Sequence, residues 1–523
     1  IQRIFDYGMY RFGAMTDPDG VPAGLQGPWL EDDKLVPWNG DYHFNINVQE
    51  CYSPAYRGGH FEHLMPLFRM ILGWRPLLRE NAKRFVGIGD GYVLPHSVDD
   101  RGVCIGGFWT GTIDHASTAW VAAMMMKYVR YSGDVAFLKN EAYDFMKGAM
   151  RVYRTMMEER NGRLSVPLGP SPEWCGADVR KAVGRDPSFQ LAAAHRLARD
   201  LIDAAARLGE KPDPMWLDVE KRLPAFTAGE GGISLFEGQP LVETHRHHSH
   251  MAGFYPFDTI DIKANRGIVD ETYSIWHLRG TGMWTGWCVP WASILNLHVG
   301  NDRAAVELLR CWDAYFCNDG HGSHHNAVHS GFTAWNNGLS VMQMDGQCAA
   351  TTAVMELLVH EVNGKVEFFK GCPPEWKDVS FENIRLADGT SVSMASIAVL
   401  SNGFLAPVQA VDKSGTAWVF DRLGFEGPGA VGSMSRMGEE TIETVTTYGS
   451  DVTANPKPKF GEVVTEETTL GFAFGDERES FRLVPNGKGG VAVYEAGTAN
   501  PLLTVSSAFA NGLLSFSFTS KTG

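Results

Sequence analysis

The spacing of hydrophobic positions changes near residue 364. Before it, apolar side chains recur every three or four residues in successive segments, which is the pattern of amphipathic helices. These segments are 63–78, 119–131, 142–157, 189–208, 287–297, 304–315 and 349–362. Glycine- and proline-rich connectors separate them. This part of the chain is therefore predicted to be a succession of packed helices.

After residue 364, β-branched and alternating segments replace the helical pattern, which indicates strands joined by turns. The segments are 366–369, 379–386, 392–399, 417–420, 441–447, 466–474 and 502–518. Runs of helices followed by runs of strands indicate separate domains and not an alternating α/β sheet. We expect a helical domain over residues 1–363 and an antiparallel β domain over residues 364–523.

The predicted helices recur at intervals of roughly 30 residues. This spacing fits a toroid of helical hairpins, and it fits a bundle or an irregular solenoid equally well. Spacing alone does not choose between these architectures.

Composition excludes some classes of protein. The 523 residues carry a formal net charge of -15 and no basic run, so nucleic acid is not an expected partner. No apolar stretch reaches the roughly 18 residues that span a bilayer, so no membrane partner is expected. The eight cysteines form no C-x-x-C pair and are expected to be buried thiols.

The chain begins at Ile1, without a methionine and without the charged and apolar regions of a signal peptide. We expect that a signal peptide was removed or that an N-terminal piece is missing. The expected location is periplasmic or secreted, with the cytoplasm as the alternative.

Glu173 is the first candidate for catalysis. It follows Pro172, which favours a loop-like backbone, and Trp174 beside it offers an apolar wall that would raise the pKa of the carboxyl group. A carboxylic acid of this kind suits protonation of a leaving oxygen in glycoside hydrolysis. The alternative is that Glu173 lies in a solvated connector.

The segment His43-Phe44-Asn45-Ile46-Asn47 alternates polar and apolar residues. In an extended strand, the side chains of His43, Asn45 and Asn47 would point to the same side. They would then form a polar row along one wall of a pocket. The alternative is a set of amides that satisfy backbone groups in turns or helix caps.

Asp345 precedes Gly346 just before the helical pattern that starts at residue 349. An Asp-Gly pair at this place fits the N-cap of a helix. It also fits a carboxylate that works in a site, and the two roles are compatible.

Histidines gather in two clusters, and neutral imidazole is a common zinc ligand. The clusters are His245, His247, His248 and His250, and His321, His324, His325 and His329. No H-E-x-x-H motif occurs, and sugar pockets also use histidine, arginine and tryptophan to hold hydroxyl groups. We therefore expect hydroxyl binding, with no metal and no other cofactor.

Several segments together resemble the catalytic domain of glycoside hydrolase family 95, in the order found in that family. They are 7–11, 20–29 (GVPAGLQGPW), 42–54, 131–134, 169–174, 245–250 with 255–256, 286–287, and 343–346. The resemblance covers about residues 7–375. It implies an (α/α)6 toroid as the catalytic domain, followed here by the β domain, which we expect to be sandwich-like.

The resemblance also implies an activity: inverting exo-hydrolysis of α-L-fucosides or α-L-galactosides in oligo- or polysaccharides. Glu173 matches the general acid, Asn45 and Asn47 match amides that activate water, and Asp345 matches the carboxylate that polarises them. Three further residues match sugar-binding positions: His43, Arg246 and His247. Across the pocket, Glu173 and the amides are expected to stand roughly 6.5–9.5 Å apart.

Two segments depart from the family pattern, and one of them is Gln347-Cys348-Ala349, where Asn-Phe-Gly commonly follows the Asp-Gly pair. In the other, the usual Trp-Pro-x-Gly-Gly-Ala-Trp is replaced by residues 114–120, DHASTAW. We expect Asp114 and His115 to line the pocket and contact hydroxyl groups, beside Trp174, and to move specificity away from simple L-fucose. The alternatives to a hydrolase are another (α/α)6 enzyme such as a polysaccharide lyase, or an inactive sugar-binding protein.

Overall fold

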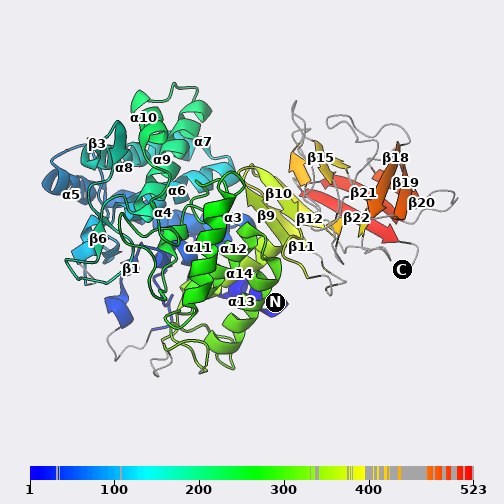
Figure 1. The fold of residues 1–523 in the computed structure, drawn as a ribbon, viewed down its shortest axis with the longest axis horizontal. Helices are drawn as coiled ribbons and strands as arrows, with labels where there is room; N and C mark the ends of the chain where they lie inside the picture. Colours follow the sequence, from blue (N-terminus) through cyan, green and yellow to red (C-terminus); the bar gives the residue numbers. More distant parts are fainter. Residues whose placement is uncertain are drawn as a thin grey trace. The chain divides into compact units, whose positions relative to one another are not determined.

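The computed structural model describes residues 1–394 except 31–32, 34–35, 107–108, 330, 336–340, 374–375, 377–378 and 380, and after residue 394 it describes strands alone. The chain divides into two compact units. Unit 1 comprises Ile1–Tyr56 and His60–Val354, and unit 2 comprises Arg57–Gly59 and Met355–Gly523. Unit 1 is mainly helical, and unit 2 is mainly built from strands (Figure 1).

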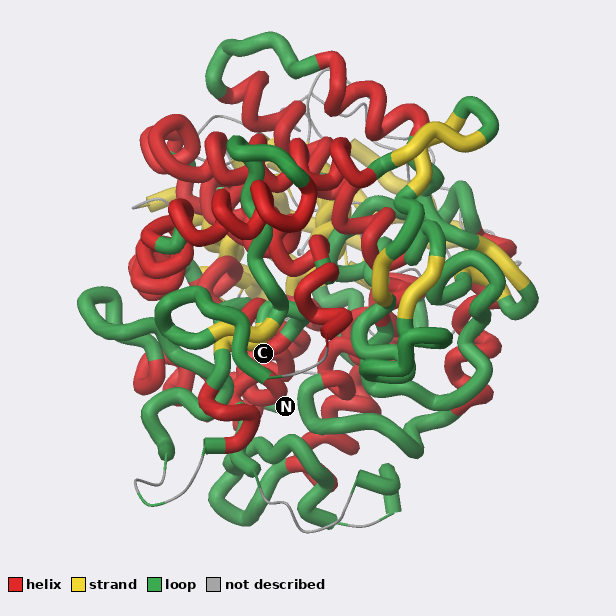
Figure 2. The backbone as a smooth tube through the Cα atoms, turned by 90° about the vertical axis from the view of Figure 1, so that its left-hand side faces the viewer, coloured by secondary structure: helices red, strands yellow, loops and turns green. Residues whose placement is uncertain are grey.

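Helices joined by long loops make up unit 1 (Figure 2). They are α1 (Gln2–Met15), α2 (Asn47–Cys51), α3 (Pro54–Gly58), α4 (Met65–Gly73), α5 (Arg75–Val86), α6 (His115–Ser132), α7 (Val135–Phe137), α8 (Tyr143–Met156), α9 (Ser188–Arg207), α10 (Pro214–Arg222), α11 (Arg266–Arg279), α12 (Cys288–Val299), α13 (Asp302–Phe316) and α14 (Met344–Leu358). Helix α3 has its last residues in unit 2, and α14 continues from unit 1 into unit 2.

Most of the predicted helical segments are helices, but two differ from the prediction. The segment 63–78 contains two helices, α4 and α5, because Pro76 has no amide hydrogen with which to continue a helix from α4. The segment 349–362 is displaced, since α14 already begins at Met344 and ends at Leu358. Its last residues form strand β9 (Val359–Val362), which pairs with β10 (Lys365–Phe368).

Helix α12 forms part of the centre of unit 1. Its residues are buried on every side apart from His298, and α12 packs along α13. A helix that is apolar all round is stable only in the interior of a protein. The segment that leads into α12 also passes close to the start of α14, where a Cβ on Gly346 would lie 2.9 Å from the carbonyl oxygen of Gly286. This close approach places Asp345 deep in the interior.

Three candidate residues stand at helix N-termini in unit 1. Asn47 is the first residue of α2, Asp114 is the N-cap of α6, and Asp345 lies in the first turn of α14. Free amide groups and the helix dipole at such ends stabilise polar and negatively charged groups.

Unit 1 also contains two-stranded ladders, and the first of them carries His43. The ladders are β1 (Tyr42–His43) with β2 (Ser97–Val98), β3 (Glu158–Arg160) with β4 (Arg163–Ser165), β5 (Gly169–Pro170) with β6 (Val183–Gly184), and β7 (Ala228–Gly229) with β8 (Gly232–Ile233). In the first ladder, His43 stands opposite Ser97.

Two larger sheets contain most of the described strands of unit 2. The first has the order β14 (Gln409–Val411), β15 (Ala417–Phe420), β17 (Met434–Arg436), β10, β9. The second has the order β11 (Phe381–Arg385), β12 (Ser391–Met394), β22 (Leu513–Ser520), β21 (Leu503–Ala510), β20 (Gly490–Glu495), β19 (Glu477–Pro485), β18 (Thr468–Phe474). A short pair, β13 (Phe404–Leu405) with β16 (Leu423–Gly424), stands apart from both.

The sequence predicts an antiparallel β domain, but the second sheet is not purely antiparallel. Strands β12 and β22 run parallel, with Ser391 opposite Leu513, and the other ladders are antiparallel. A parallel pair needs a long connection, and more than a hundred residues separate these two strands along the chain. The single predicted segment 502–518 forms two strands, β21 and β22, and the predicted strand 441–447 lies outside the described residues.

The predicted domain boundary at residues 363–364 falls in the turn between β9 and β10, within unit 2. A division into domains at that turn stays a prediction. Among the described helices, none has the length and apolar composition needed to cross a lipid bilayer.

Candidate active site

The segment that carries His43, Asn45 and Asn47 is not the extended strand that the alternation predicts. Strand β1 covers only Tyr42 and His43, residues 44–46 form a turn, and α2 begins at Asn47. All three polar side chains are buried, as are the intervening Phe44 and Ile46. Because of the turn, His43 and Asn45 contact the carboxylate of Glu173, whereas Asn47 contacts that of Asp345.

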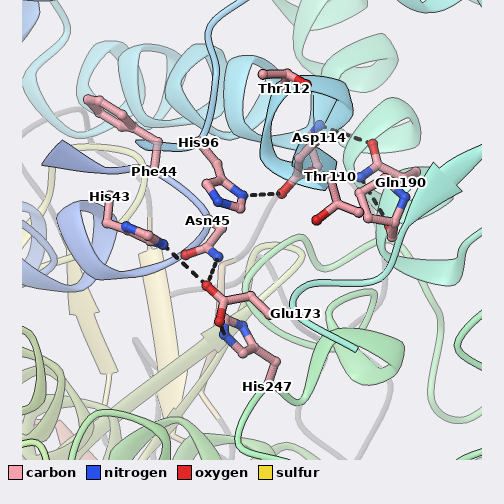
Figure 3. A network of polar contacts seen from close by, with 12 residues as sticks. His43, Phe44, Asn45, His96, Thr110, Thr112, Asp114, Glu173, Gln190 and His247 are labelled. Carbon is pink, nitrogen blue, oxygen red and sulfur yellow. Dashed lines mark hydrogen bonds and ion pairs between the residues drawn. The ribbon is translucent and has the colours of Figure 1, made fainter. Parts of the chain in front are cut away.

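The first carboxylate belongs to Glu173, whose side chain is only 9% exposed. Asn45 Nδ2 donates to Glu173 Oε1 at 2.9 Å, and His43 Nε2 lies 3.2 Å from the same oxygen (Figure 3). Arg246 donates through Nη2 to Oε2, and His247 Nε2 lies 3.7 Å from Oε2. Glu173 is therefore surrounded by donors and does not lie in a solvated connector.

These contacts determine which groups carry charge. Burial disfavours the charged form of Glu173, but hydrogen bonds from His247 and His43 and the positive charge of Arg246 hold its pKa well below the usual range. Burial alone would lower the pKa of His43, yet hydrogen bonds to Asp41 and Glu173 raise it to about 10. Burial lowers the pKa of His247 to about 4. Without substrate, the site therefore contains an ionised Glu173, a protonated His43 and a neutral His247.

The second carboxylate, Asp345, is fully buried and pairs with the other amide. Asn47 Nδ2 donates to Asp345 Oδ2 at 2.6 Å, and the backbone amide of Gly346 donates to Oδ1 at 2.6 Å. Burial raises the pKa of Asp345 to about 7, although the hydrogen bond from Asn47 opposes this shift. Asp345 is not the N-cap that its Asp-Gly pair suggested, since α14 begins one residue before it.

The two amides therefore have different partners. The sequence predicts that both face Glu173 across a pocket, but Asn45 touches Glu173 directly. The carbonyl oxygen Oδ1 of Asn45 is buried and accepts no hydrogen bond from the described residues. This oxygen is a free acceptor beside the carboxylate.

A small recess adjoins Glu173. Its lining residues include His96, Thr110, Asp114, Ser171, Glu173 and Trp174. Asp114 and Trp174 thus lie where the sequence predicts, beside the candidate acid. Trp174 is 4% exposed and meets His245 edge to face at a centroid distance of 5.4 Å.

His115 does not line this recess, unlike its neighbour Asp114. Its ring packs against Phe85 and Tyr153, with centroid distances of 5.5 and 6.2 Å. Burial lowers its pKa to about 4. The helical turn at the start of α6 explains the difference, because successive side chains on a helix point in directions about 100° apart.

Three polar residues of the site were not identified from the sequence. Asp41 Oδ2 accepts from His43 Nδ1 at 2.8 Å, Gln190 Nε2 donates to Asp114 Oδ1 at 2.7 Å, and His96 lies between His43 and Asp114. A signal existed for Asp41, since it continues the alternation of His43 and Asn45 by two residues. For His96 and Gln190 the local sequence offers none.

Metal binding was tested on the geometry of possible ligands. Among the described residues, His43, His96 and Glu173 offer ligand atoms within 4.8 Å of one another, as do His60, Glu62 and His63, and neither histidine cluster predicted from sequence does so. In the first group, Arg246 already neutralises Glu173 and both nitrogens of His43 face carboxylates. Hydrogen bonds and ion pairs therefore account for the positions of His43 and Glu173.

Replacing Asp41 tests the electrostatic origin of the charge on His43. The change Asp41→Asn removes the negative charge 2.8 Å from Nδ1, so we expect the pKa of His43 to fall below about 10. Titration of the His43 ring by NMR measures this pKa. Asp258→Asn, next to His298 at 3.4 Å, is a matched control that leaves His43 unaffected. An unchanged His43 titration in Asp41→Asn would contradict the assignment.

Comparisons with known proteins identify the family of the chain. The model of the glycosyl hydrolase family 95 catalytic domain matches residues 1–358. "Probable alpha-fucosidase A" of Aspergillus niger is 25% identical over 424 residues, which cover 75% of this chain and 51% of the relative. "Alpha-L-fucosidase 2" of Arabidopsis thaliana is 24% identical over 415 residues, covering 75% and 48%.

The chain thus spans about half the length of these curated relatives. A solved structure titled "Putative kojibiose phosphorylase from human microbiome" shares the fold, with a TM-score of 0.53 at 10% identity, over 99% of this chain and 59% of that one. The match of the family model over more than half of the sequence is decisive: the chain belongs to glycosyl hydrolase family 95 through a catalytic domain at residues 1–358.

Proposed function

We propose that the chain is an inverting exo-glycosidase that hydrolyses α-L-fucosides or related L-sugar glycosides, such as α-L-galactosides, in oligo- or polysaccharides. The helical part would be an (α/α)6 toroid. One observation carries the proposal: two buried carboxylates, Glu173 and Asp345, each hold the amide of an asparagine from one short segment. Inverting hydrolysis needs an acid on one side of the bond and an activated water on the other.

In this mechanism Glu173 protonates the leaving oxygen. Because its carboxylate is ionised in the substrate-free site, it must first receive a proton. His43 holds one at Nε2, 3.2 Å from Glu173 Oε1, and Asp41 stabilises the imidazolium from the other side. A substrate that draws Arg246 away from Oε2 would raise the pKa of Glu173 and favour this transfer.

The asparagines serve the attacking water. Asp345, when ionised, accepts from Asn47 Nδ2 and increases the electron density on the carbonyl oxygen of that amide. The buried Oδ1 of Asn45 provides a second acceptor for the water. His43, Arg246, His247, Asp114 and Trp174 surround Glu173 and would contact the sugar. His115 packs against Phe85 and Tyr153 and is not among the lining residues of the recess, so we assign it no contact with the substrate.

Stereochemistry of the product tests the proposal. Aryl α-L-fucosides and α-L-galactosides are incubated with the protein while proton NMR follows the anomeric signals. We expect the β-anomer of the free sugar to appear first, because a single displacement inverts the anomeric carbon. The α-anomer first would exclude inversion, and an unsaturated product absorbing in the ultraviolet would indicate a lyase.

The change Glu173→Gln tests the general acid. We expect turnover to fall by about two to four orders of magnitude on glycosides with poor leaving groups, and much less on activated aryl glycosides, because an acidic phenol needs little help from an acid. Rates on both substrate types are compared with the wild type. Glu220→Gln is a matched control, since Glu220 also pairs with a histidine and an arginine, each at 2.7 Å. Wild-type rates on poor leaving groups would place the acid elsewhere.

Asp345 predicts a pH dependence. Its pKa is raised to about 7, and only the ionised form polarises Asn47, so kcat/KM should fall as the pH decreases through about 7. Asp345→Asn should lack this acidic limb and slow both activated and poor substrates by about two to four orders of magnitude. Asp200→Asn, at a buried aspartate paired with Arg130 and Arg196, should retain the limb. A wild-type profile that is flat between pH 5 and 8 would contradict this role.

A further inference from the structure

Two buried polar side chains in the recess beside Glu173 lack the partners they need. Asp114 is 1% exposed and His96 is 3% exposed. Among the described residues, none forms a hydrogen bond with Asp114 Oδ2 or with either ring nitrogen of His96. Buried polar atoms in native proteins are almost always satisfied, so such a pair requires an explanation.

Both side chains are held in place by their surroundings. Gln190 Nε2 donates to Asp114 Oδ1 at 2.7 Å, which leaves Oδ2 directed at His96. The ring of His96 packs against the backbone of Gly111, where a Cβ would lie 2.4 Å from Nε2. The two groups are therefore positioned before any ligand arrives.

The distance between them suits a bridging oxygen atom. His96 Nδ1 and Asp114 Oδ2 lie 3.6 Å apart, too far for a good hydrogen bond (Figure 3). One oxygen placed about 2.8 Å from each atom fits this separation. A hydroxyl group has the required chemistry, because it accepts from the N–H of His96 and donates to the carboxylate of Asp114.

The position of this pair connects it with the reaction. One ring nitrogen of His96, one of His43 and one carboxylate oxygen of Glu173 lie within 4.8 Å of one another. Asp114, His96 and Glu173 also line the same recess. A group held by His96 and Asp114 would therefore lie close to the candidate acid.

We propose that His96 and Asp114 together bind one hydroxyl group of the sugar whose glycosidic bond is cleaved. This inference rests on the proposed function and adds His96 to the substrate-binding residues. It also limits the substrate, because a methyl group or a hydrogen atom at that position would leave both polar groups buried without partners.

The test uses aryl α-L-glycosides without hydroxyl groups on the aryl part. The parent is the α-L-galactoside, and analogues lack one ring or exocyclic hydroxyl each, the α-L-fucoside being the analogue without the 6-hydroxyl. We expect wild-type kcat/KM to fall by about 10- to 100-fold for the analogue that lacks the bound hydroxyl. In Asp114→Asn an amide donor replaces the acceptor, so this variant should lose activity on the parent and no longer discriminate against that one analogue.

Asp200→Asn is the matched control for losing a buried aspartate charge, and it should keep the wild-type pattern on all analogues. His96→Leu tests the pair from the other side and serves if Asp114→Asn fails to fold, as judged by circular dichroism. The proposal is overturned if every analogue shows the same relative loss in wild type, Asp114→Asn and His96→Leu. In that case the pair holds a water molecule and not the substrate.

Failure of the proposed function gives a different result. If the wild type hydrolyses none of these glycosides, the hydrolase assignment fails, and binding of free L-galactose and its deoxy analogues is then measured by saturation-transfer NMR. A deoxy position that weakens binding in the wild type but not in Asp114→Asn would still support the hydroxyl site. Equal binding of all analogues by the wild type would exclude it.

Discussion

Burial of the Glu173 carboxylate is the constraint on which the rest of the site depends. An ionised carboxylate inside a protein is tolerated only when cations and hydrogen-bond donors replace the water it loses. Here Arg246, His43 and Asn45 supply these groups, and they come from two distant parts of the chain. The loop of Glu173, the turn after β1 and the segment with Arg246 must therefore adopt one arrangement together. Removing any one donor leaves a buried charge partly unpaired.

The second carboxylate shows how much the surroundings matter. Asp345 is as deeply buried as any residue of the site, yet its hydrogen-bond donors include an amide side chain and a backbone amide, and these donors together with the charge of His43 do not offset the effect of burial. Its pKa is accordingly raised to about 7, while that of Glu173 is held low. Separated pKa values of paired carboxyl groups are characteristic of acid and base chemistry. In the substrate-free site this order is the reverse of the proposed roles. In the proposed mechanism His43, whose pKa is raised to about 10, would supply the proton to Glu173.

At residues 114–120, where the sequence departs from the family pattern, a buried carboxyl group again requires hydrogen-bond partners. This group belongs to Asp114, and Gln190 from α9 donates to its Oδ1. Its other oxygen faces His96, which directly precedes β2, the strand that pairs with β1. Asp114 thus lines the recess. The ring of the adjacent His115 instead packs between helices, against Phe85 of α5 and Tyr153 of α8.

Much of the local structure and the chemical class follows from the sequence by itself. The spacing of apolar residues indicates α4, α6, α8, α9, α12, α13 and α14, and some of the described strands of unit 2, because burial of one face selects its own periodicity. The residue types around Glu173, Asn45 and Asp345, in their order along the chain, indicate the family. Secondary structure depends mainly on neighbours along the chain, and family membership can be recognised from short sequence motifs.

Tertiary structure decided the pairing of side chains. Whether Asn45 meets Glu173 or Asp345, and whether Asp114 or His115 faces the recess, depends on the turn after β1 and on the rotation of α6. His96 and Gln190 have no distinctive sequence setting and gain a role only because distant backbone segments bring them to Asp114. The parallel pairing of β12 with β22 is likewise a contact across more than a hundred residues. Local propensities do not contain such long-range contacts, since these form only when the whole chain is packed.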